Sequence, residues 1–368
     1  MAAGTSTSAD AVQIDVRTAS GRYAIRIGPG ISARLGQALD AAGLPARRFV
    51  VSSPSVWRFH GARFTQATAD DPILIPDGER FKHLATVGRI YDGLIRARAD
   101  RSSALVAIGG GVVGDVAGFA AATYLRGVPV VQVPTTLLAQ VDSAIGGKVG
   151  VNHPMGKNLI GSFHAPAVVV VDPALLATLP RREFRAGLYE VVKYGMIASR
   201  ELFDRLGRGL KAIFAREPAA LMPVIVESCR IKASVVEADE HEAGARRTLN
   251  FGHTAGHAFE SLTKYRRFRH GEAIAYGMMA AAELAAARGV LTRTDQEALG
   301  SLITQMGPLP AIADLSAHEV AEATSRDKKV VAGRLHFVLP TSIGSTTIVD
   351  DVTSAELVRA LQQIGLKA

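Results

Sequence analysis

Five polar side chains recur at helical spacing in the segment RRTLNFGHTAGHAFE. They are Arg246, Asn250, His253, His257 and Glu260, which follow one another at steps of four, three, four and three residues. On a single α-helix these steps would place all five side chains on one face. Exposed helix faces usually carry Lys and Glu, and buried faces carry Leu and Ala, so a face with Arg, Asn and two His indicates the wall of a functional site.

Two histidines at this spacing, HTAGH, occur in zinc enzymes. The Glu of the H-E-x-x-H motif is missing, which argues against a zinc protease. Another set of metal ligands is possible, in which Glu190, His253 and His270 come from three separate helices. Three protein ligands would leave positions on the metal for a substrate. Spacing alone, however, favours a surface ion pair for Glu190 with Lys193, and a capping or solvent-facing role for His270.

A glycine-rich segment, GGGVVGD, lies between the predicted strand ALVAI and the helix-like VAGFAAATY. Its Gly109, Gly111 and Gly114 satisfy the G-x-G-x-x-G pattern of strand–turn–helix nucleotide sites, where glycines let backbone N–H groups approach a diphosphate. No Asp or Glu follows about twenty residues later to bind a ribose. We therefore expect a variant nucleotide site.

The following segment, 134–164, contains many glycines and many polar or charged side chains. The latter include Thr135, Thr136, Asp142, Lys148, Asn152, Lys157 and Asn158. The apolar residues show too little periodicity for a helix or a strand, so we expect a loop. Such a loop could bind phosphate and carboxylate groups, or be an ordinary solvated loop. Arg126, between a predicted helix and a predicted strand, allows the same two interpretations.

Composition narrows the class of protein. The 368 residues are 48% hydrophobic and 21% charged, as in a globular protein of about two domains. The single cysteine, Cys229, excludes an internal disulfide framework and is expected to be a buried, inert thiol. The net charge of +8 could indicate nucleic acid, but Lys and Arg are scattered and only 6% of residues are aromatic. A small anionic substrate explains the positive charge equally well.

The sequence lacks targeting and membrane signals. The first ten residues, MAAGTSTSAD, do not have the pattern of a secretory signal, and we expect them to form a disordered tail. The longest apolar stretch, 273–287, is interrupted by Glu283. These features predict a cytoplasmic protein that binds neither membrane nor nucleic acid.

The pattern of predicted elements divides the chain into two domains. The β-rich runs RRFVVSS, ALVAIGGG, VPVVQVP and PAVVVVDP alternate with helix-like segments, which predicts a parallel sheet. The expected helices of the second half are 182–198, 219–238, 246–262, 271–289 and 354–365, with a late strand or hairpin at 333–349. We therefore expect an α/β protein with a Rossmann-like parallel-sheet domain over residues 11–179 and a mostly α-helical domain over 180–368. A cleft between two domains is a common location for a site.

Several of these segments, taken in order between about Pro76 and Gly344, resemble the 3-dehydroquinate synthase family. They are GGGVVGD, PTTLLAQVDSAIGGK, NHPMGKNLIGSFHAP, TLPRREFRAGLYEVVKYG, LNFGHTAGHAFE, HGEAIAYGM and DKK with FVLPTSIG. These motifs are long and specific. The wider kin are sugar-phosphate cyclases and, more distantly, iron- or zinc-dependent polyol dehydrogenases.

The resemblance implies a tightly bound NAD and one divalent metal, zinc or cobalt, held by Glu190, His253 and His270. It places the NAD contacts on Asp77, Gly78, Glu79, Lys82, Gly111, Val112, Val113, Gly114, Asp115, Thr135, Thr136, Lys148, Lys157, Leu175 and Thr178. Family members often carry an acidic residue just after the first cofactor strand, where this chain has Ser52 and Ser53. The chain thus departs from the family at a position used for ribose binding.

The family reaction converts 3-deoxy-D-arabino-heptulosonate 7-phosphate into 3-dehydroquinate and phosphate, the second step of the shikimate route to aromatic amino acids. The resemblance implies transient oxidation of the C5 hydroxyl by NAD, elimination of phosphate, reduction, ring opening and intramolecular aldol closure. The substrate's own phosphate would be the base for the elimination.

The resemblance also implies roles for individual residues. Lys232 and Arg246 would face the substrate carboxylate. The phosphate would be faced by Lys148, Asn158, Asn250, His257, Lys328 and an Arg126 donated by the other subunit of a homodimer. Asp142, Lys193 and Glu242 would contact ring hydroxyls or the metal-bound water. Together, the expected catalytic residues are Asp142, Lys148, Lys193, Glu242, Arg246, Asn250 and His257.

Three other functions have to be weighed against this one. A related cyclase acting on a heptulose without a carboxylate would give Lys232 and Arg246 no substrate carboxylate to bind. A polyol dehydrogenase of the same fold would have no use for the lysine-rich loop. A protein that kept the fold and lost the chemistry would not need every motif position for metal, phosphate and carboxylate to be filled.

Overall fold

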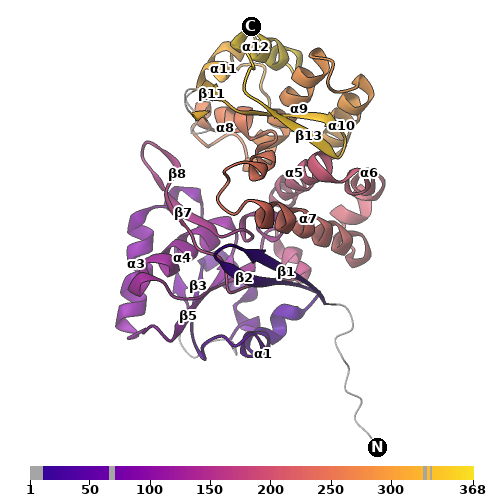
Figure 1. Cartoon of the computed structure of the whole chain (residues 1–368). Coiled ribbons are helices and arrows are strands. Elements are labelled where there is room, and N and C mark those ends of the chain that lie inside the picture. The colour runs from indigo at the N-terminus through magenta and orange to yellow at the C-terminus, as the bar shows by residue number, and fades with distance from the viewer. Residues whose placement is uncertain (1–10, 66–70, 326–329, 332–333) are drawn as a thin grey trace, which may run out of the picture. The chain divides into compact units, whose positions relative to one another are not determined.

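The computed structural model describes residues 11–65, 71–325, 330–331 and 334–368 (Figure 1). The chain forms two compact units. Unit 1 comprises Met1–Pro180 and Arg216–Glu240, and unit 2 comprises Arg181–Ala215 and His241–Ala368. The boundary expected near 179–182 falls at the first of these junctions, but residues 216–240, placed by the sequence pattern in the second domain, group with unit 1. The expected tail over residues 1–10 lies outside the described residues.

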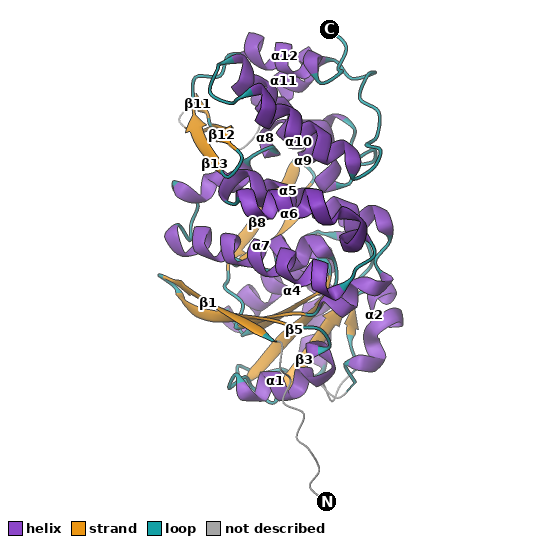
Figure 2. Ribbon diagram, turned by 90° about the vertical axis from the view of Figure 1, so that its right-hand side faces the viewer, coloured by secondary structure: helices purple, strands orange, loops and turns teal. Residues whose placement is uncertain are grey.

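Unit 1 is built around a sheet (Figure 2) of seven strands. Their order is β1-β2-β9-β6-β5-β3-β4. The strands are β1 (Val12–Thr18), β2 (Gly21–Ile27), β3 (Arg47–Ser52), β4 (Ile73–Leu74), β5 (Ser103–Gly109), β6 (Val130–Pro134) and β9 (Val168–Val171). All neighbours are parallel except β1 and β2, which form an antiparallel hairpin at one edge. The four expected strands are β3, β5, β6 and β9, so the Rossmann-like parallel sheet is confirmed.

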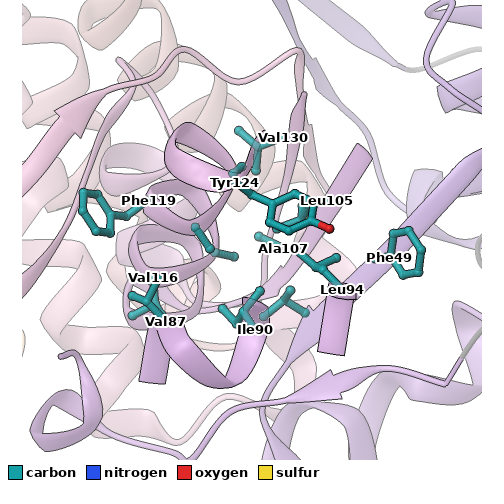
Figure 3. Close-up of a cluster of buried hydrophobic side chains, with 14 of the residues drawn as sticks. Phe49, Val87, Ile90, Leu94, Leu105, Ala107, Val116, Phe119, Tyr124 and Val130 are labelled. Carbon is teal, nitrogen blue, oxygen red and sulfur yellow. The ribbon is translucent and has the colours of Figure 1, made fainter. Parts of the chain in front are cut away.

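Helices cover both faces of this sheet. They are α1 (Leu35–Ala41), α2 (Pro54–His60), α3 (Leu84–Arg96), α4 (Gly111–Thr123) and α7 (Pro218–Ala238), with short 3₁₀ helices at Ile31–Arg34, Gly61–Arg63, Glu79–Phe81, Tyr124–Arg126 and Pro173–Thr178. Successive residues of β5 point to opposite faces. Leu105 and Ala107 pack with α3 and α4 (Figure 3), whereas Val106 packs with α1. Gly118 lets α4 approach its neighbours closely, since a Cβ there would lie 2.3 Å from Val149 Cγ1.

The segment 134–164, expected to be a loop, contains regular elements. A π-helical turn (Ala139–Ser143) is followed by an antiparallel hairpin of β7 (Lys148–His153) and β8 (Gly156–Phe163). Val149 and Val151 of β7 are buried against α4, whereas most of β8 is exposed. The expectation of a loop was wrong because only one of the two strands has an alternating apolar face.

Unit 2 is mostly α-helical. Its helices are α5 (Arg181–Ala198), α6 (Arg200–Phe214), α8 (His253–Leu262), α9 (His270–Ala287), α10 (Arg293–Gln305), α11 (Ala317–Ser325) and α12 (Ser354–Gln363). Two small antiparallel sheets are formed by β10 (Val330–Val331) with β11 (Arg334–Leu335), and by β12 (Phe337–Ser342) with β13 (Ser345–Val349). The helices expected at 182–198, 271–289 and 354–365 and the late hairpin are confirmed. Within the described part of the chain, no helix has the length and apolar character needed to cross a membrane.

The single helix expected over 246–262 is interrupted. A 3₁₀ helix (Ala245–Asn250) precedes α8, and Gly252 between them is left-handed, with a φ of 77°. A Cβ on Gly252 would lie 2.8 Å from the Ile274 carbonyl oxygen of α9, so this close approach requires glycine. The expectation of one continuous face was therefore wrong, because its first two residues lie on a different element from its two histidines.

Candidate functional site

Three candidate metal ligands converge in unit 2. Glu190 lies in the middle of α5 and is fully buried, whereas His253 and His270 are the first residues of α8 and α9. Glu190 Oε1 is 3.7 Å from His253 Nε2 and 3.5 Å from His270 Nε2. One ligand atom from each of the three residues lies within 4.8 Å of the other two. Three helices thus bring together a carboxylate and two imidazoles that are distant in sequence.

Both imidazoles are oriented through their Nδ1 atoms. His253 Nδ1 is 3.2 Å from the Phe251 carbonyl oxygen, and His270 Nδ1 is 3.4 Å from Glu260 Oε2. These oxygens accept hydrogen bonds, so in the neutral rings the proton is held on Nδ1 and Nε2 offers a lone pair on the side of Glu190. Zinc sites use this arrangement of carboxylate and imidazole ligands with outer acceptors fixing each ring. The donor set therefore fits a divalent metal.

Glu260, the last residue of the predicted polar face, acts on His270. Its side chain is buried, and its carboxylate lies beside His270 Nδ1. Burial alone would lower the pKa of His270, but the charges and hydrogen bonds of Glu260 and Glu190 outweigh it and raise the pKa to about 10. A metal binding at Nε2 has to displace a proton from this ring.

Lys193 and Glu190 form a buried ion pair. Lys193 Nζ is 2.5 Å from Glu190 Oε2, and the two side chains are 1% and 0% exposed. The expectation of a surface pair was wrong, because every residue of α5 from 186 to 197 is buried. Two charges at this depth are tolerated only when they are paired and further hydrogen-bonded. The candidate metal ligand therefore lies against a fixed positive charge.

The remaining candidate residues of unit 2 that the structure describes lie on or beside the 3₁₀ helix that precedes α8, and on α8 itself. The 3₁₀ helix Ala245–Asn250 contacts α5, and Arg246 on it is 1% exposed. Asn250 Nδ2 donates to Glu242 Oε1 at 2.8 Å. The ring of His257 is 5.5 Å from that of His253 and 6.1 Å from that of His270, measured between centroids. Lys328 lies outside the described residues.

The glycine-rich turn of unit 1 has the geometry of a phosphate site. β5 ends at Gly109 and α4 begins at Gly111, with Gly110 as N-cap residue and no side-chain cap among the described residues. A Cβ on Gly110 would lie 3.0 Å from Thr136 Cγ2, so a larger residue would fill the turn. Backbone N–H groups at a helix N-terminus, together with the helix dipole, attract anions. The Thr135 N–H at the end of β6 is already bonded to the Gly109 carbonyl, at 2.9 Å.

A polar network connects the candidate cofactor and phosphate residues of unit 1. Lys82 Nζ is 2.5 Å from both Asp115 Oδ2 and Asn158 Oδ1. Burial alone would lower the pKa of Lys82, but Asp115 and Glu79 raise it, so this lysine stays charged. Glu79 Oε1 is also 4.0 Å from Lys157 Nζ. The network joins residues 79–82, the start of α4 and the β7–β8 hairpin.

The carboxylate of Asp77 lies near Ser52 and Ser53, the positions where this chain departs from the family. Ser52 is buried and donates its hydroxyl to the Ile108 carbonyl at 2.8 Å. Asp77 accepts from Ser55, with Oδ1 at 2.5 Å from the hydroxyl and Oδ2 at 3.2 Å from the N–H. Burial alone would raise the pKa of Asp77, but hydrogen bonds from Ser53 and Ser55 lower it. An ionised carboxylate therefore lies next to the position where the acidic residue is missing.

Four further candidate residues of unit 1 lie on α7, on the π-helical turn, on β7 and on a 3₁₀ helix. Lys232 of α7 forms an ion pair with Asp142 of the π-helical turn. Lys148 begins β7 and is exposed, as is Arg126 at the end of the 3₁₀ helix Tyr124–Arg126.

The last two candidate cofactor residues lie on the 3₁₀ helix Pro173–Thr178. Leu175 is a core residue, so only its backbone is able to contact a cofactor. Thr178 Oγ1 is 2.8 Å from His60 Nε2.

Glu272 holds the first turn of α9, which begins at His270, and the sequence analysis missed it. Glu272 is fully buried and accepts from Arg182, with distances of 2.8 Å and 2.7 Å, and from Arg185 at 3.3 Å. It also accepts from the Arg269 N–H at 2.8 Å, which fixes the first turn of α9. Burial alone would raise the pKa of Glu272, but these donors lower it. The Glu three residues after the N-cap is a capping-box signal that could have identified it.

Solved structures share this fold. ValA, a 2-epi-5-epi-valiolone synthase from Streptomyces hygroscopicus with NAD+ and Zn2+ bound, has a TM-score of 0.84 and 29% identity, covering 93% of this chain and 96% of that one. A 2-deoxy-scyllo-inosose synthase complexed with carbaglucose-6-phosphate, NAD+ and Co2+ has a TM-score of 0.84 and 25% identity, covering 96% and 100%. The fold is thus that of the dehydroquinate synthase-like class, with a Rossmann-like unit and a helical unit.

Sequence comparison identifies the family within this class. Family models described as 3-dehydroquinate synthase N-terminal and 3-dehydroquinate synthase C-terminal match residues 72–186 and 187–330. The 3-dehydroquinate synthase of Synechococcus sp. is 49% identical over 366 residues, which cover 96% of this chain and 99% of that protein. That of Nostoc punctiforme is 46% identical over 359 residues, covering 95% and 98%. The chain belongs to the 3-dehydroquinate synthase family.

Proposed function

We propose that this chain converts 3-deoxy-D-arabino-heptulosonate 7-phosphate into 3-dehydroquinate and phosphate, as a carbon–oxygen lyase of the shikimate route in the cytoplasm. The observation that carries the proposal is the cluster of His253 and His270 around the fully buried Glu190, with the Lys193 ammonium 2.5 Å from the Glu190 carboxylate. Curated relatives that are 46% and 49% identical bear the name of the enzyme with this activity.

We further propose that NAD and one zinc or cobalt ion bind to the chain. Two solved structures of the same fold are described with NAD+ and with Zn2+ or Co2+. Glu190, His253 and His270 would hold the metal, and the N-terminus of α4 would hold the diphosphate of NAD. The metal would supply Lewis-acid polarisation of a substrate hydroxyl, and NAD would supply a reversible hydride acceptor. Asp77 would replace the missing acidic residue at the ribose.

The residues of unit 2 would bind and orient one side of the substrate. Lys193, fixed against Glu190, would stabilise negative charge that develops on the hydroxyl oxygen. Asn250, held by Glu242, and His257, beside the ligand histidines, would bind the substrate phosphate.

Four of the candidate residues would bind the two anionic groups of the substrate. Lys232 and Arg246 would bind the carboxylate, while Lys148 and Asn158 bind the phosphate. Asp142, through its ion pair with Lys232, would contact a ring hydroxyl. Holding the phosphate against the neighbouring C–H would let the substrate's own phosphate act as base in the elimination.

We also propose a homodimer in which Arg126 of one chain binds the substrate phosphate of the other. Arg126 is exposed and has a φ of 71°. A left-handed conformation is uncommon for a residue other than glycine, and such residues are retained where the structure uses them. The partner's Arg126 would add a guanidinium to the phosphate ligands.

The decisive experiment is incubation of the purified chain with the heptulosonate phosphate, NAD and zinc or cobalt. We expect phosphate to be released without net accumulation of NADH. Stoichiometric NADH would instead support a polyol dehydrogenase, and activity only with another sugar phosphate would support a related cyclase. No phosphate release and no retained metal would overturn all of these enzymatic functions.

A further inference from the structure

A second group of possible metal ligands lies on α8 and α9. His257, Glu260 and His270 each offer one ligand atom, and these atoms lie within 4.8 Å of one another. His257 and Glu260 are three residues apart on α8, so their side chains lie on the same face of that helix. His270 is the first residue of α9. Two imidazoles and one carboxylate are the same types of ligand that form the candidate cluster of Glu190, His253 and His270.

The two groups of ligands share only His270, and each faces a different nitrogen of its ring. His270 Nε2 is 3.5 Å from Glu190 Oε1, whereas His270 Nδ1 is 3.4 Å from Glu260 Oε2. The two nitrogens lie at different edges of an imidazole, so a ligand at one of them leaves the other accessible. The two groups therefore define separate positions for an ion, one at each nitrogen of His270.

The spacing of the second group fits a tetrahedral ion. Zinc binds imidazole nitrogen and carboxylate oxygen at about 2.0–2.2 Å, which puts neighbouring ligand atoms about 3.3–3.6 Å apart in a tetrahedral site. The distance of 3.4 Å between His270 Nδ1 and Glu260 Oε2 lies in this range. The ring centroids of His257 and His270 are 6.1 Å apart. Two imidazoles on one zinc ion have centroids about 5 Å apart, so a movement of about 1 Å by His257 would complete the site.

The burial of Glu260 distinguishes this group from a cluster on the surface. The Glu260 side chain is 4% exposed and that of His270 is 32% exposed, while His257 is partly buried. The carboxylate is thus fixed by packing, and the exposed part of His270 leaves the position accessible from solvent. Ligands that are held before an ion arrives lose little conformational entropy when they bind it.

We propose that a second divalent ion binds to His257, Glu260 and His270 Nδ1 when zinc exceeds one equivalent per chain. With the first ion at Nε2, His270 bridges the two ions. The bond between Nδ1 and its proton breaks, a bond between Nδ1 and the second ion forms, and the proton goes to solvent. The second ion binds more weakly than the first, because two dications on one ring repel each other. Three protein ligands leave this ion with an open position.

The second ion would inhibit the enzyme, and this consequence alone rests on the proposed function. His257 would become a ligand of the ion and could no longer donate a hydrogen bond to the substrate phosphate. The open position of the ion would bind phosphate, which would slow its release after the elimination. The metal that the first site requires would therefore lower the rate when it is in excess.

The test is the number of zinc ions that the purified full-length chain binds, measured by equilibrium dialysis and metal analysis. The native chain should bind one ion at limiting zinc and two at excess zinc. His257→Ala should bind one ion throughout, and its retention of that ion shows that the variant is folded. His153→Ala, at an exposed histidine of β7, is the matched control and should bind two. A native chain that binds only one ion overturns the proposal, and so does a His257→Ala chain that binds two.

A second measurement tests the inhibition. Excess zinc should slow phosphate release by the native chain and by His153→Ala roughly tenfold or more, because a hydrogen bond to a charged group is lost. A chelator that returns zinc to one equivalent should restore the rate. The lower rate of His257→Ala should not respond to excess zinc, and an equal response would overturn the inhibitory role of this site. Two bound ions without phosphate release at any zinc concentration would contradict the proposed function and support the second site.

Discussion

The candidate metal site of unit 2 and the phosphate candidates of unit 1 are held in opposite ways. In unit 2, Glu190 and Lys193 are fully buried, and the rings of His253 and His270 each have Nδ1 within 3.4 Å of an oxygen acceptor. In unit 1, the phosphate candidates of the hairpin and turn are exposed. Buried groups are fixed by packing before a ligand arrives, whereas exposed groups become ordered with a ligand or a partner. The candidate cluster of unit 2 is therefore preformed, whereas we expect the exposed candidates of unit 1 to become ordered only with a ligand or a partner.

Removing a ligand from the preformed cluster is expected to have the largest effect. His253→Ala should lower metal occupancy and reduce phosphate release by roughly 10³-fold or more, because a catalytic metal site needs its three protein ligands. His257→Ala, one turn further along α8, should keep the metal and lose rate. Metal analysis with a phosphate-release assay distinguishes the two outcomes, and equal loss of metal in both variants would contradict the division of roles.

The proposed contribution of Arg126 to the site of a second chain can be tested with hybrid dimers. Arg126→Ala and His253→Ala should each be nearly inactive as homodimers. Hybrids carrying one chain of each kind, purified through two different tags, should regain about half of the native rate, since one of their two sites would be complete. A hybrid as inactive as its parents would show that Arg126 acts within its own chain.

The buried ion pair offers a comparison with a surface pair in the same unit. Lys193→Met should lower the free energy of unfolding by about 3 kcal/mol or more, because it leaves a buried carboxylate without this partner. Arg205→Met removes an exposed pair with Glu201, 2.8 Å apart on α6, and should change stability by less than about 1 kcal/mol. Urea denaturation measures both. Similar small losses would mean that Glu190 is not held by Lys193.

A smaller effect is expected at Glu260. Glu260→Gln keeps the shape of the side chain and removes its charge, which should weaken metal affinity by about 10- to 100-fold through the orientation and basicity of His270. Competition with a chromogenic chelator measures this without any turnover. Unchanged affinity would show that the contact of 3.4 Å between Glu260 and His270 does not orient the ring.

The sequence was sufficient for the parallel sheet and for α4, α5, α7, α9 and α12, because buried strands and long apolar helices have strong local patterns. The long family motifs in the sequence also predicted Glu190, His253 and His270 as a metal set. Spacing alone could not relate these three residues, because they meet only by tertiary packing. The break at Gly252 escaped prediction because it depends on the close approach of α9, which is a contact between distant segments.

The β7–β8 hairpin escaped prediction for a related reason. Apolar and polar residues alternate along a strand when one of its faces is buried. β8 is largely exposed, so its sequence lacks this alternation. The burial of Lys193 was missed as well, because an i,i+3 pair has the same spacing on a surface helix and on a buried one. A local sequence pattern predicts whether a residue is buried or exposed only when the residues next to it in the sequence lie in the same environment.

The interruption of unit 1 by residues 181–215 also sets an order of events during synthesis. The end of α7 covers β1 through Glu237, which follows its partner Arg17 by 220 residues. At a synthesis rate of about 5–20 residues per second, β1 emerges on the order of ten seconds or more before its cover. During that interval the nascent chain presents an open strand edge, so the completion of α7 is the step that ends its exposure to aggregation.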